Sequence, residues 1–346
     1  MIEKNFWKKV IIDDKKKIRD VIARLNSTKL QIIIVVNLKK KFIGTITDGD
    51  IRRGLFKGCS LNDNIKKIIN TKSAYVSPEL SYQDAKILMK ADWIRHMPVV
   101  DKSKRVKGLH LLNDVSNKKV PYKFVIMAGG FGKRLRPFTN NIPKPMIKIA
   151  NKPILEHIIL NAKTYGFKNF VISVHYLHKK VTKHFENGKK LNIKIKYIHE
   201  KKPKGTAASL RILKSNKNIP ILVTNGDVIS SVDYAKIIDY HKKNNSDATV
   251  VIRNITQKNP YGVVKLKKTK ITGFSEKENL VLNINTGIYV LNSKVLKFLN
   301  KDKEDMPDFL EKLLKKKKKI LAYPIYENWI DIGTKINLKT FKNSFN

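Results

Sequence analysis

Residues 123–145 read KFVIMAGGFGKRLRPFTNNIPKP, and the fold of the larger part of the chain can be predicted from them. Its first five residues are mostly apolar, which is typical of a short buried strand, and a glycine-rich loop follows directly. Small residues after a strand let backbone N–H groups approach phosphate oxygens closely. Arg134 and Lys144 follow in the same stretch and add cationic donors for phosphate oxygens. The stretch therefore predicts a strand and a phosphate-binding loop in an α/β sheet.

The loop matches neither of two common phosphate-binding patterns. No Lys-Ser or Lys-Thr pair follows its last glycine, and Leu135 stands where a dinucleotide fingerprint has its last glycine. The string from Gly129 to Pro145 instead resembles the signature of the sugar-nucleotide pyrophosphorylases, the sugar-1-phosphate nucleotidyltransferases. Lys133 departs from that family, which usually has Thr or Ser there. Further segments resemble the family in order: 200–210 (EKKPKGTAASL), 223–227 (VTNGD), 261–264 (YGVV), 274–277 (FSEK), 285–289 (NTGIY) and 329–333 (WIDIG).

The resemblance implies a doubly wound, mostly parallel, Rossmann-like nucleotidyltransferase domain over residues 121–346. It implies that a sugar 1-phosphate attacks the α-phosphorus of a nucleoside triphosphate and releases pyrophosphate, with Mg²⁺ as the cofactor. The catalytic cations would be Arg134, Lys144 and Lys277. The nucleotide would be held by Ala128, Gly129, Gly130, Gly132, Glu200, Gly205 and Thr206. The sugar would contact Gly262, Glu276 and Asn285. The metal ligands would be Asp227 and Asp331, because two carboxylates with phosphates and waters satisfy a hard cation.

The base preference depends on Glu200, which lies where the family places its base-reading side chain. Guanine offers two N–H donors on one edge, which a carboxylate can accept, whereas uracil and thymine suit an amide better. The sequence therefore favours GTP, with uridylyl or thymidylyl transfer as an alternative. A CBS pair fused to such a domain resembles the enzymes of bacterial nonulosonate (legionaminic-acid-type) pathways, which make GDP-activated glucosamine-type sugars. Mannose- and heptose-1-phosphate guanylyltransferases are close competitors.

The first third of the chain contains an internal repeat. Residues 44–50 (GTITDGD) and 108–114 (GLHLLND) align with a period of 64, and each follows an apolar strand pattern and an amphipathic helical pattern. These stretches, with 96–101 (HMPVVD), resemble a tandem pair of CBS modules, which we place at residues 1–120. The resemblance implies that Thr47 and Asp50 hold the ribose of AMP or ATP. Leu111 replaces the threonine in the second copy and cannot hydrogen-bond.

Two interpretations of the CBS pair are equally favoured: a regulatory adenosine-nucleotide site, and a scaffold that only joins subunits. Because CBS pairs usually associate, we expect a homo-oligomer. A catalytically inactive, nucleotide-sensing regulatory subunit is a rival to the enzyme. The presence of all four of the residues Arg134, Lys144, Asp227 and Asp331 disfavours that rival.

Charge is the extreme feature of the composition. Lys and Arg total 72 against 28 Asp and Glu, a formal charge of +44. Such a surface attracts phosphorylated substrates and weak, salt-sensitive polyanion contacts. The excess is mostly lysine, is spread along the chain, and accompanies abundant Ile and Asn, which favours an AT-rich genome as its cause. Since no nucleic-acid motif is recognised, we expect no specific nucleic-acid partner.

The cellular location of the protein is predicted from three kinds of sequence feature: membrane-spanning segments, a signal peptide and cysteine pairs. No apolar run approaches the ~20 residues of a membrane-spanning helix. The first ten residues contain no apolar signal-peptide core. The single Cys59 excludes an internal disulfide. We therefore expect a cytoplasmic protein without a membrane partner.

Overall fold

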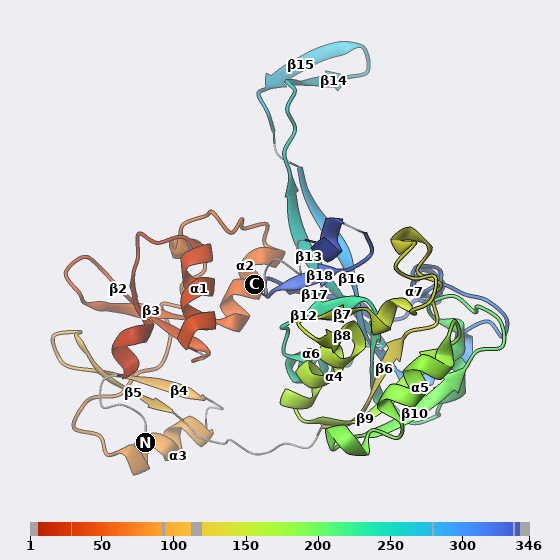
Figure 1. Cartoon of the computed structure of the whole chain (residues 1–346). Helices are drawn as coiled ribbons and strands as arrows, with labels where there is room; N and C mark the ends of the chain where they lie inside the picture. Colours follow the sequence, from red (N-terminus) through yellow and green to blue (C-terminus); the bar gives the residue numbers. More distant parts are fainter. Residues whose placement is uncertain are drawn as a thin grey trace. The chain divides into compact units, whose positions relative to one another are not determined.

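The structure is a computed structural model that describes residues 6–28, 30–91, 94–111, 120–278, 280–334 and 336–339. The chain separates into two compact units, residues 1–116 and 117–346 (Figure 1). The last three residues of the second sequence repeat, 112–114, lie outside the described residues. So do residues 115–119, directly before the domain boundary expected at residue 120. Among the described residues, none of the helices has the length and hydrophobicity of a membrane-spanning segment.

The first unit consists of two modules of the same order, a helix followed by an antiparallel hairpin. The period of 64 is confirmed by the strand registers. Val35 pairs with Gly44 in the first hairpin, Val99 pairs with Gly108 in the second, and the register shifts directly after each valine. The elements of the unit are η1 (Phe6–Val10), β1 (Ile11–Asp13), α1 (Ile18–Thr28), β2 (Ile32–Val36), β3 (Phe42–Thr47), α2 (Asp48–Phe56), η2 (Ile65–Lys67), α3 (Tyr82–Ala91), β4 (His96–Val100) and β5 (Val106–Leu111).

The helical patterns of this unit are borne out with one exception. The apolar face of α1, at residues 18, 21, 22 and 25, is buried. Ala85 and Met89 of α3 are fully buried, whereas Leu88, which shares their spacing, is 45% exposed. The apolar face of α3 is therefore narrower than its sequence pattern predicts.

The second unit is built on a seven-stranded sheet in the order β10-β9-β6-β11-β16-β13-β17. Four neighbouring strands, β10, β9, β6 and β11, are parallel, and β16 is antiparallel to both of its neighbours. The mostly parallel sheet is thus confirmed. Its strands are β6 (Val120–Met127), β9 (Phe167–Val174), β10 (Lys194–His199), β11 (Pro220–Asn225), β13 (Ala248–Gln257), β16 (Leu280–Asn292) and β17 (Ile320–Ile325).

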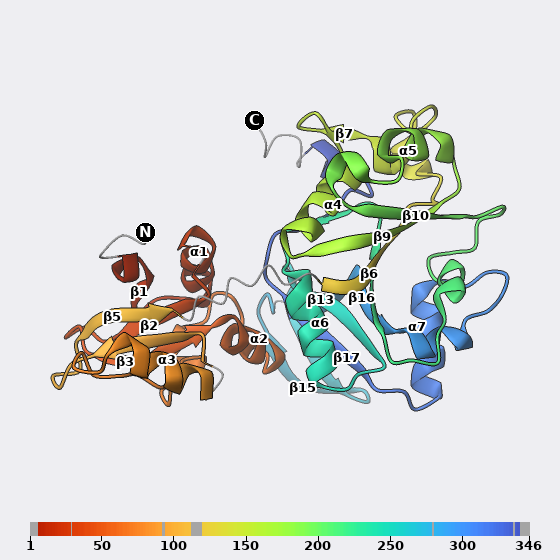
Figure 2. The ribbon, with the colours of Figure 1, turned by 90° about the horizontal axis from the view of Figure 1, so that it is seen from below.

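Both faces of this sheet are covered, as in a doubly wound fold. Alternate residues of β6 enter two different cores because successive side chains of a strand point to opposite faces. Phe124 and Ile126 join one core, and Val125 joins the other. Figure 2 shows α4 and α6 on one side of the sheet and α7 on the other. The helices are α4 (Ile154–Thr164), α5 (His178–Phe185), α6 (Tyr234–Lys243) and α7 (Met306–Lys315).

Short elements surround the carboxyl ends of the parallel strands. The register pairs Asn225 of β11 with Met127 of β6, so the loops that follow these two strands lie side by side. A small antiparallel pair, β12 and β18, aligns Val228 with Asp331. The remaining elements are η3 (Lys133–Leu135), η4 (Lys144–Met146), β7 (Lys148–Ile149), β8 (Lys152–Pro153), η5 (Lys189–Leu191), η6 (Ala208–Leu213), β12 (Val228–Ser230), η7 (Ser293–Phe298) and β18 (Trp329–Asp331).

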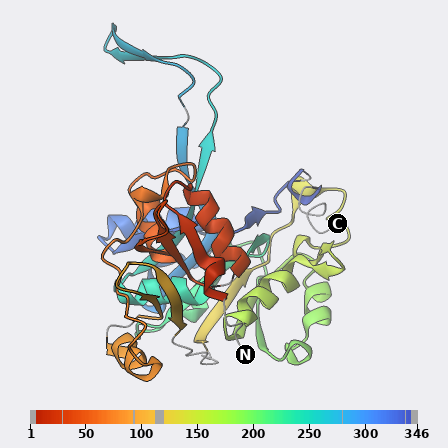
Figure 3. The same cartoon turned by 90° about the vertical axis from the view of Figure 1, so that its left-hand side faces the viewer.

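A two-stranded arm, residues 252–285, projects from this sheet (Figures 1 and 3). At its base β13 and β16 stay paired from Ile252 with Asn285 to Gln257 with Leu280. Its tip is a separate hairpin of β14 (Val263–Lys267) and β15 (Lys270–Ser275). The register of β13 and β16 shifts between Val250 and Ile252, and β13 stays paired with β17 as far as Arg253.

Candidate active site

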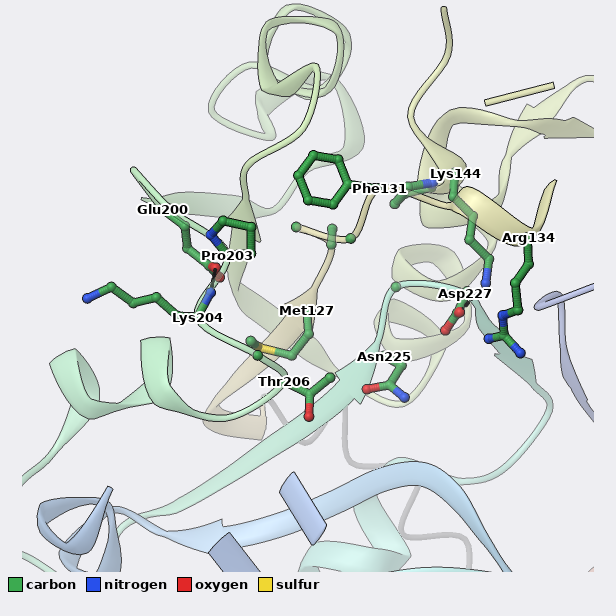
Figure 4. Close-up of a pocket in the computed structure, with 16 residues that line it drawn as sticks. Met127, Phe131, Arg134, Lys144, Glu200, Pro203, Lys204, Thr206, Asn225 and Asp227 are labelled. Carbon is green, nitrogen blue, oxygen red and sulfur yellow. Dashed lines mark hydrogen bonds and ion pairs between the residues drawn. The ribbon is translucent and has the colours of Figure 1, made fainter. Parts of the chain in front are cut away.

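A cavity of about 340 Å³ lies at the carboxyl ends of β6 and β11 (Figure 4). This is where ligands bind in open α/β sheets. Of the seven residues predicted to hold the nucleotide, all but Gly132 line it. Of the predicted catalytic and metal-binding residues, Arg134, Lys144 and Asp227 line it as well. Its remaining lining residues are Met127, Phe131, Pro145, Pro203, Lys204, Asn225 and Gly226.

The glycines of the loop serve different purposes. Gly132 has φ of +64°, and a Cβ there would lie 2.9 Å from the Thr139 side chain. The Thr139 hydroxyl also donates a 2.9 Å hydrogen bond to the Gly132 carbonyl. Gly132 therefore shapes the loop and does not line the cavity. A Cβ on Gly130 would meet no described atom within 4 Å, so its backbone is open to a ligand.

The carboxylate of Glu200 is held in place by groups from β9 and from its own loop. The buried Ser173 hydroxyl donates a 2.5 Å hydrogen bond to Oε1. The backbone N–H of Lys204 donates to Oε2 at 3.1 Å. A Cβ on Gly129 would lie 3.5 Å from Oε1, so the carboxylate borders the phosphate loop. Each oxygen keeps one lone pair for a further donor.

Gly205 and Thr206 fasten the same loop to the start of α7. Gly205 has φ of +76°, and a Cβ there would lie 2.5 Å from the backbone oxygen of Glu304. Only glycine fits such a close approach in this conformation. The Thr206 N–H donates to Asp305 at 2.9 Å, and the Thr206 hydroxyl accepts from the Met306 N–H at 2.8 Å. Both residues therefore shape the wall of the cavity.

Lys144 lies between two carboxylates at the edge of the cavity. Its ammonium forms an ion pair with Asp227 and lies 4.0 Å from Oδ1 of Asp331. The backbone joins the same two aspartates, since the Ile332 N–H donates to the Asp227 carbonyl at 3.0 Å. Residues 104 positions apart in the sequence are thus brought together by the β12–β18 pair.

The electrostatics of this cluster suit a divalent cation. Burial raises the pKa of Asp331, the charge of Asp227 raises it further, and Lys144 and Arg134 offset part of this effect. Oδ1 of Asp331 is buried and has no hydrogen-bond partner among the described residues. The described residues contain no group of three or more metal-binding side chains. Two carboxylates whose remaining ligands come from phosphates and water match the preference of Mg²⁺.

The residues predicted to bind the sugar and the predicted catalytic Lys277 do not line this cavity. Gly262, Glu276 and Lys277 are exposed on the arm. Asn285 is exposed at the base of the arm, where its side chain accepts a 3.0 Å hydrogen bond from the Gly287 N–H. Their roles stay predictions.

The cavity also contains residues that the sequence reading did not assign. Lys204, Asn225 and Phe131 line it, and Ser173 orients Glu200. Lys204 and Asn225 lie inside segments that resemble the family, so their place in those segments could have indicated them. Nothing in the local sequence of Ser173 distinguishes it from an ordinary buried serine.

In the first unit, Thr47 and Asp50 bind each other at the start of α2. The Thr47 N–H and hydroxyl donate to Oδ2 of Asp50 at 2.8 and 2.6 Å. Arg53 donates to Oδ1 at 2.5 Å. Thr47 and Asp50 thus form a capping box at the start of α2. The adenosine-nucleotide site at these residues stays a prediction.

Comparison with known proteins shows the family of the second unit. The Nucleotidyl transferase family model matches residues 123–344, and the CBS domain model matches residues 65–109. A mannose-1-phosphate guanyltransferase of Yarrowia lipolytica is 32% identical over 226 residues, which is 61% of this chain and 60% of the relative. A probable mannose-1-phosphate guanylyltransferase 1 of Oryza sativa subsp. japonica is 37% identical over 185 residues, covering 50% of this chain and 51% of the relative. This chain thus spans 51–60% of the length of these two relatives.

Two solved structures resemble the second unit. HddC from Yersinia pseudotuberculosis superimposes with a TM-score of 0.52 at 26% identity, covering 65% of this chain and 100% of that chain. A putative glucose-1-phosphate thymidylyltransferase from Bacillus anthracis has a TM-score of 0.53 at 23% identity, covering 64% of this chain and 94% of that chain. Because the Bacillus anthracis protein is only 23% identical to this chain, its similarity shows the fold alone.

Proposed function

The chain belongs to the nucleotidyl transferase family, and we propose that it transfers GMP from GTP to a sugar 1-phosphate, releasing pyrophosphate and forming a GDP-sugar. One observation carries the proposal. The open backbone of the glycine loop, three cationic side chains and an aspartate meet in one cavity at the carboxyl ends of parallel strands. This arrangement suits a phosphate chain whose negative charge increases during the reaction.

The reaction needs little proton transfer. A phosphate oxygen of the sugar 1-phosphate, already anionic at neutral pH, forms a bond to the α-phosphorus of GTP. The bond between the α-phosphorus and the bridging oxygen breaks, and the electron pair leaves with pyrophosphate. Arg134 and Lys144 would align the phosphates and stabilise the charge that develops on the leaving group.

Asp227 and Asp331 would hold a Mg²⁺ ion. The buried Oδ1 of Asp331, which has no hydrogen-bond partner among the described residues, and the nearby charge of Asp227 support this assignment. When bound, Mg²⁺ would neutralise phosphate charge and act as a Lewis acid toward the phosphoryl oxygens.

GTP is favoured by Glu200 and by the names of the curated relatives. The bonds from Ser173 and Lys204 leave the Glu200 carboxylate able to accept from guanine N1 and N2. For the sugar, we propose glucosamine 1-phosphate of a surface-glycan or nonulosonate pathway. Mannose 1-phosphate is the strongest alternative because curated relatives are named for it. A heptose 1-phosphate is a further alternative for the sugar. The alternative to an enzyme is a regulatory subunit without catalytic activity.

The test is pyrophosphate release with Mg²⁺, in which GTP, UTP, dTTP and CTP are crossed with glucosamine, N-acetylglucosamine, mannose and glucose 1-phosphates. Release with GTP is expected. The variant Glu200→Gln should lose the preference for GTP over UTP because an amide no longer offers two acceptors on one edge. Release with UTP or dTTP by the wild type would overturn the choice of base, and no release would favour the regulatory subunit.

A further inference from the structure

A separate cavity, of about 370 Å³, lies at the end of the sheet opposite the candidate active site. Its wall includes Pro220, the first residue of β11, and Asn292, the last residue of β16, and these two residues pair with each other. The candidate active site lies at Asn225, the last residue of β11. At about 3.3 Å per residue, the length of β11 places the two cavities on the order of 15–20 Å apart. The separate cavity is therefore distinct from the site of the proposed reaction.

Three side chains in the wall of this cavity carry a buried polar atom that has no hydrogen-bond partner among the described residues. The atoms are Nε2 of His241, the hydroxyl oxygen of Ser246 and Oδ1 of Asn292. His241 and Ser246 are only 1% and 2% exposed. Because a buried polar atom without a partner costs free energy, three of them in one wall indicate an occupant that bonds to them.

Hydrogen bonds of the surrounding segments hold these three residues together. The Ser246 N–H donates to the His241 carbonyl at 3.1 Å, and the Asn292 N–H donates to the Asp247 carbonyl at 3.0 Å. Nδ1 of His241 lies 2.9 Å from the Thr249 hydroxyl, which orients the ring. The end of α6, the start of β13 and the end of β16 therefore form one polar wall.

The charges around the cavity favour an uncharged ligand. Burial lowers the pKa of His241 to about 4, so its ring is neutral at pH 7. Of the other described residues that line the cavity, Lys242 and Asp247 are charged, and their charges are opposite. The Lys242 ammonium lies 5.6 Å from the centre of the Tyr122 ring. A phosphate would therefore meet a carboxylate as well as an ammonium, and a base stacked on that face of Tyr122 would have to displace Lys242.

We propose that this cavity binds an uncharged, hydroxyl-rich molecule of the size of a monosaccharide. A hydroxyl group both donates and accepts hydrogen bonds, so it can satisfy the Asn292 oxygen, the Ser246 hydroxyl and either tautomer of His241. The volume is that of a small-molecule site, and roughly twelve water molecules of about 30 Å³ each would be needed to fill it. Three unpartnered atoms alone require far fewer waters. Because it concerns a different cavity, this inference does not rest on the proposed function.

Titration of the protein with neutral monosaccharides tests the site. Glucose, mannose and N-acetylglucosamine are added into the millimolar range, and binding is followed by the nitrogen NMR shift of His241 Nε2, which His241→Gln identifies. A saturable shift is expected with at least one of these sugars. Ser246→Ala should raise the dissociation constant about 3- to 10-fold, because it removes one hydrogen bond to the ligand. Ser231→Ala, at an exposed serine before α6, is the matched control and should leave the constant unchanged.

Further arms of the titration decide where the sugar binds and whether charge matters. Arg134→Ala should leave the titration unchanged, because Arg134 lines the other cavity. Inorganic phosphate and AMP are the charged probes, and a shift with either of them but with none of the sugars would overturn the proposal. No shift with any sugar, or the same dissociation constant in the wild type and Ser246→Ala, would also overturn it and assign the cavity to ordered water.

Discussion

The hydroxyl of Ser173 donates a 2.5 Å hydrogen bond to Oε1 of Glu200. Ser173 is fully buried at the carboxyl end of β9, and Glu200 follows the neighbouring strand β10. The serine therefore determines the direction in which the carboxylate points into the cavity. A base-reading side chain is effective only if it keeps one orientation, so this bond links the packing of the sheet to nucleotide choice.

We predict that Ser173→Ala lowers the preference for GTP over UTP. The loss of a hydrogen bond to a charged group costs about 1.5–3 kcal/mol, which is roughly 10- to 150-fold in the ratio of kcat/KM values. Ser209→Ala is the control, because Ser209 lies 3.3 Å from the Ser173 hydroxyl. An equal loss in both variants, or none in Ser173→Ala, would show that the serine does not orient Glu200.

We predict that EDTA abolishes pyrophosphate release and that Mg²⁺ restores it. Asp227→Asn and Asp331→Asn should each lower kcat at least about 100-fold at fixed Mg²⁺, because either change removes half of the protein's anionic ligands. Asp308→Asn, at an exposed position of α7, is the control.

The same Asp331 variant should be more stable than the wild type at pH 7. The pKa of Asp331 is raised in the folded protein, chiefly by burial, so the folded state binds the proton more tightly than the unfolded state does. Stability therefore falls as pH rises from the ordinary aspartate value through the raised one, and asparagine removes this loss. A higher Tm together with lost activity is expected, and a lower Tm would contradict this reading.

We predict that Asp50→Ala destabilises the first unit by about 1 kcal/mol, as expected for loss of a helix cap. Urea unfolding of the full chain measures this change.

Thermal shift with AMP and ATP tests the predicted ribose site on the wild type. Stabilisation by either nucleotide would support a regulatory CBS pair, and indifference of both binding and activity would leave only the scaffold role.

His241 should make the second unit sensitive to mild acid. Its ring is 1% exposed and Nδ1 lies 2.9 Å from the Thr249 hydroxyl. Burial lowers its pKa to about 4, while the charge of Asp247 opposes the change. Because the unfolded state binds the proton first, stability is lost as pH falls from about 6.5 to 4, by up to about 3 kcal/mol.

Urea unfolding at pH 7 and pH 5 measures this dependence on acid. His241→Gln should flatten it, and His199→Gln, at an exposed histidine of β10, is the control. An acid dependence that is the same in both variants would assign the loss to other groups.

Local patterns predicted more of the first unit than of the second. The repeat of 64 predicted two equivalent hairpins, and the pairs Val35–Gly44 and Val99–Gly108 confirm it. In the second unit the apolar stretches indicated strands but not their neighbours. The alternation of apolar and polar side chains along a strand is the same whichever strands lie beside it. The position of β16 between β11 and β13, antiparallel to both, could therefore not be predicted from the sequence pattern.

The strand and glycine loop at residues 123–145, the family resemblance and the candidate cations could be predicted from the sequence, because each of the matching segments consists of residues close together in the chain. The tertiary structure alone decided that Lys144 lies between Asp227 and Asp331, that Ser173 orients Glu200, and that Lys277 stands away from the cavity. Each of these relationships joins segments tens of residues apart. The distances between these segments depend on the order of the strands in the sheet and on the direction of the arm. Both arise only when the apolar faces of the elements pack together.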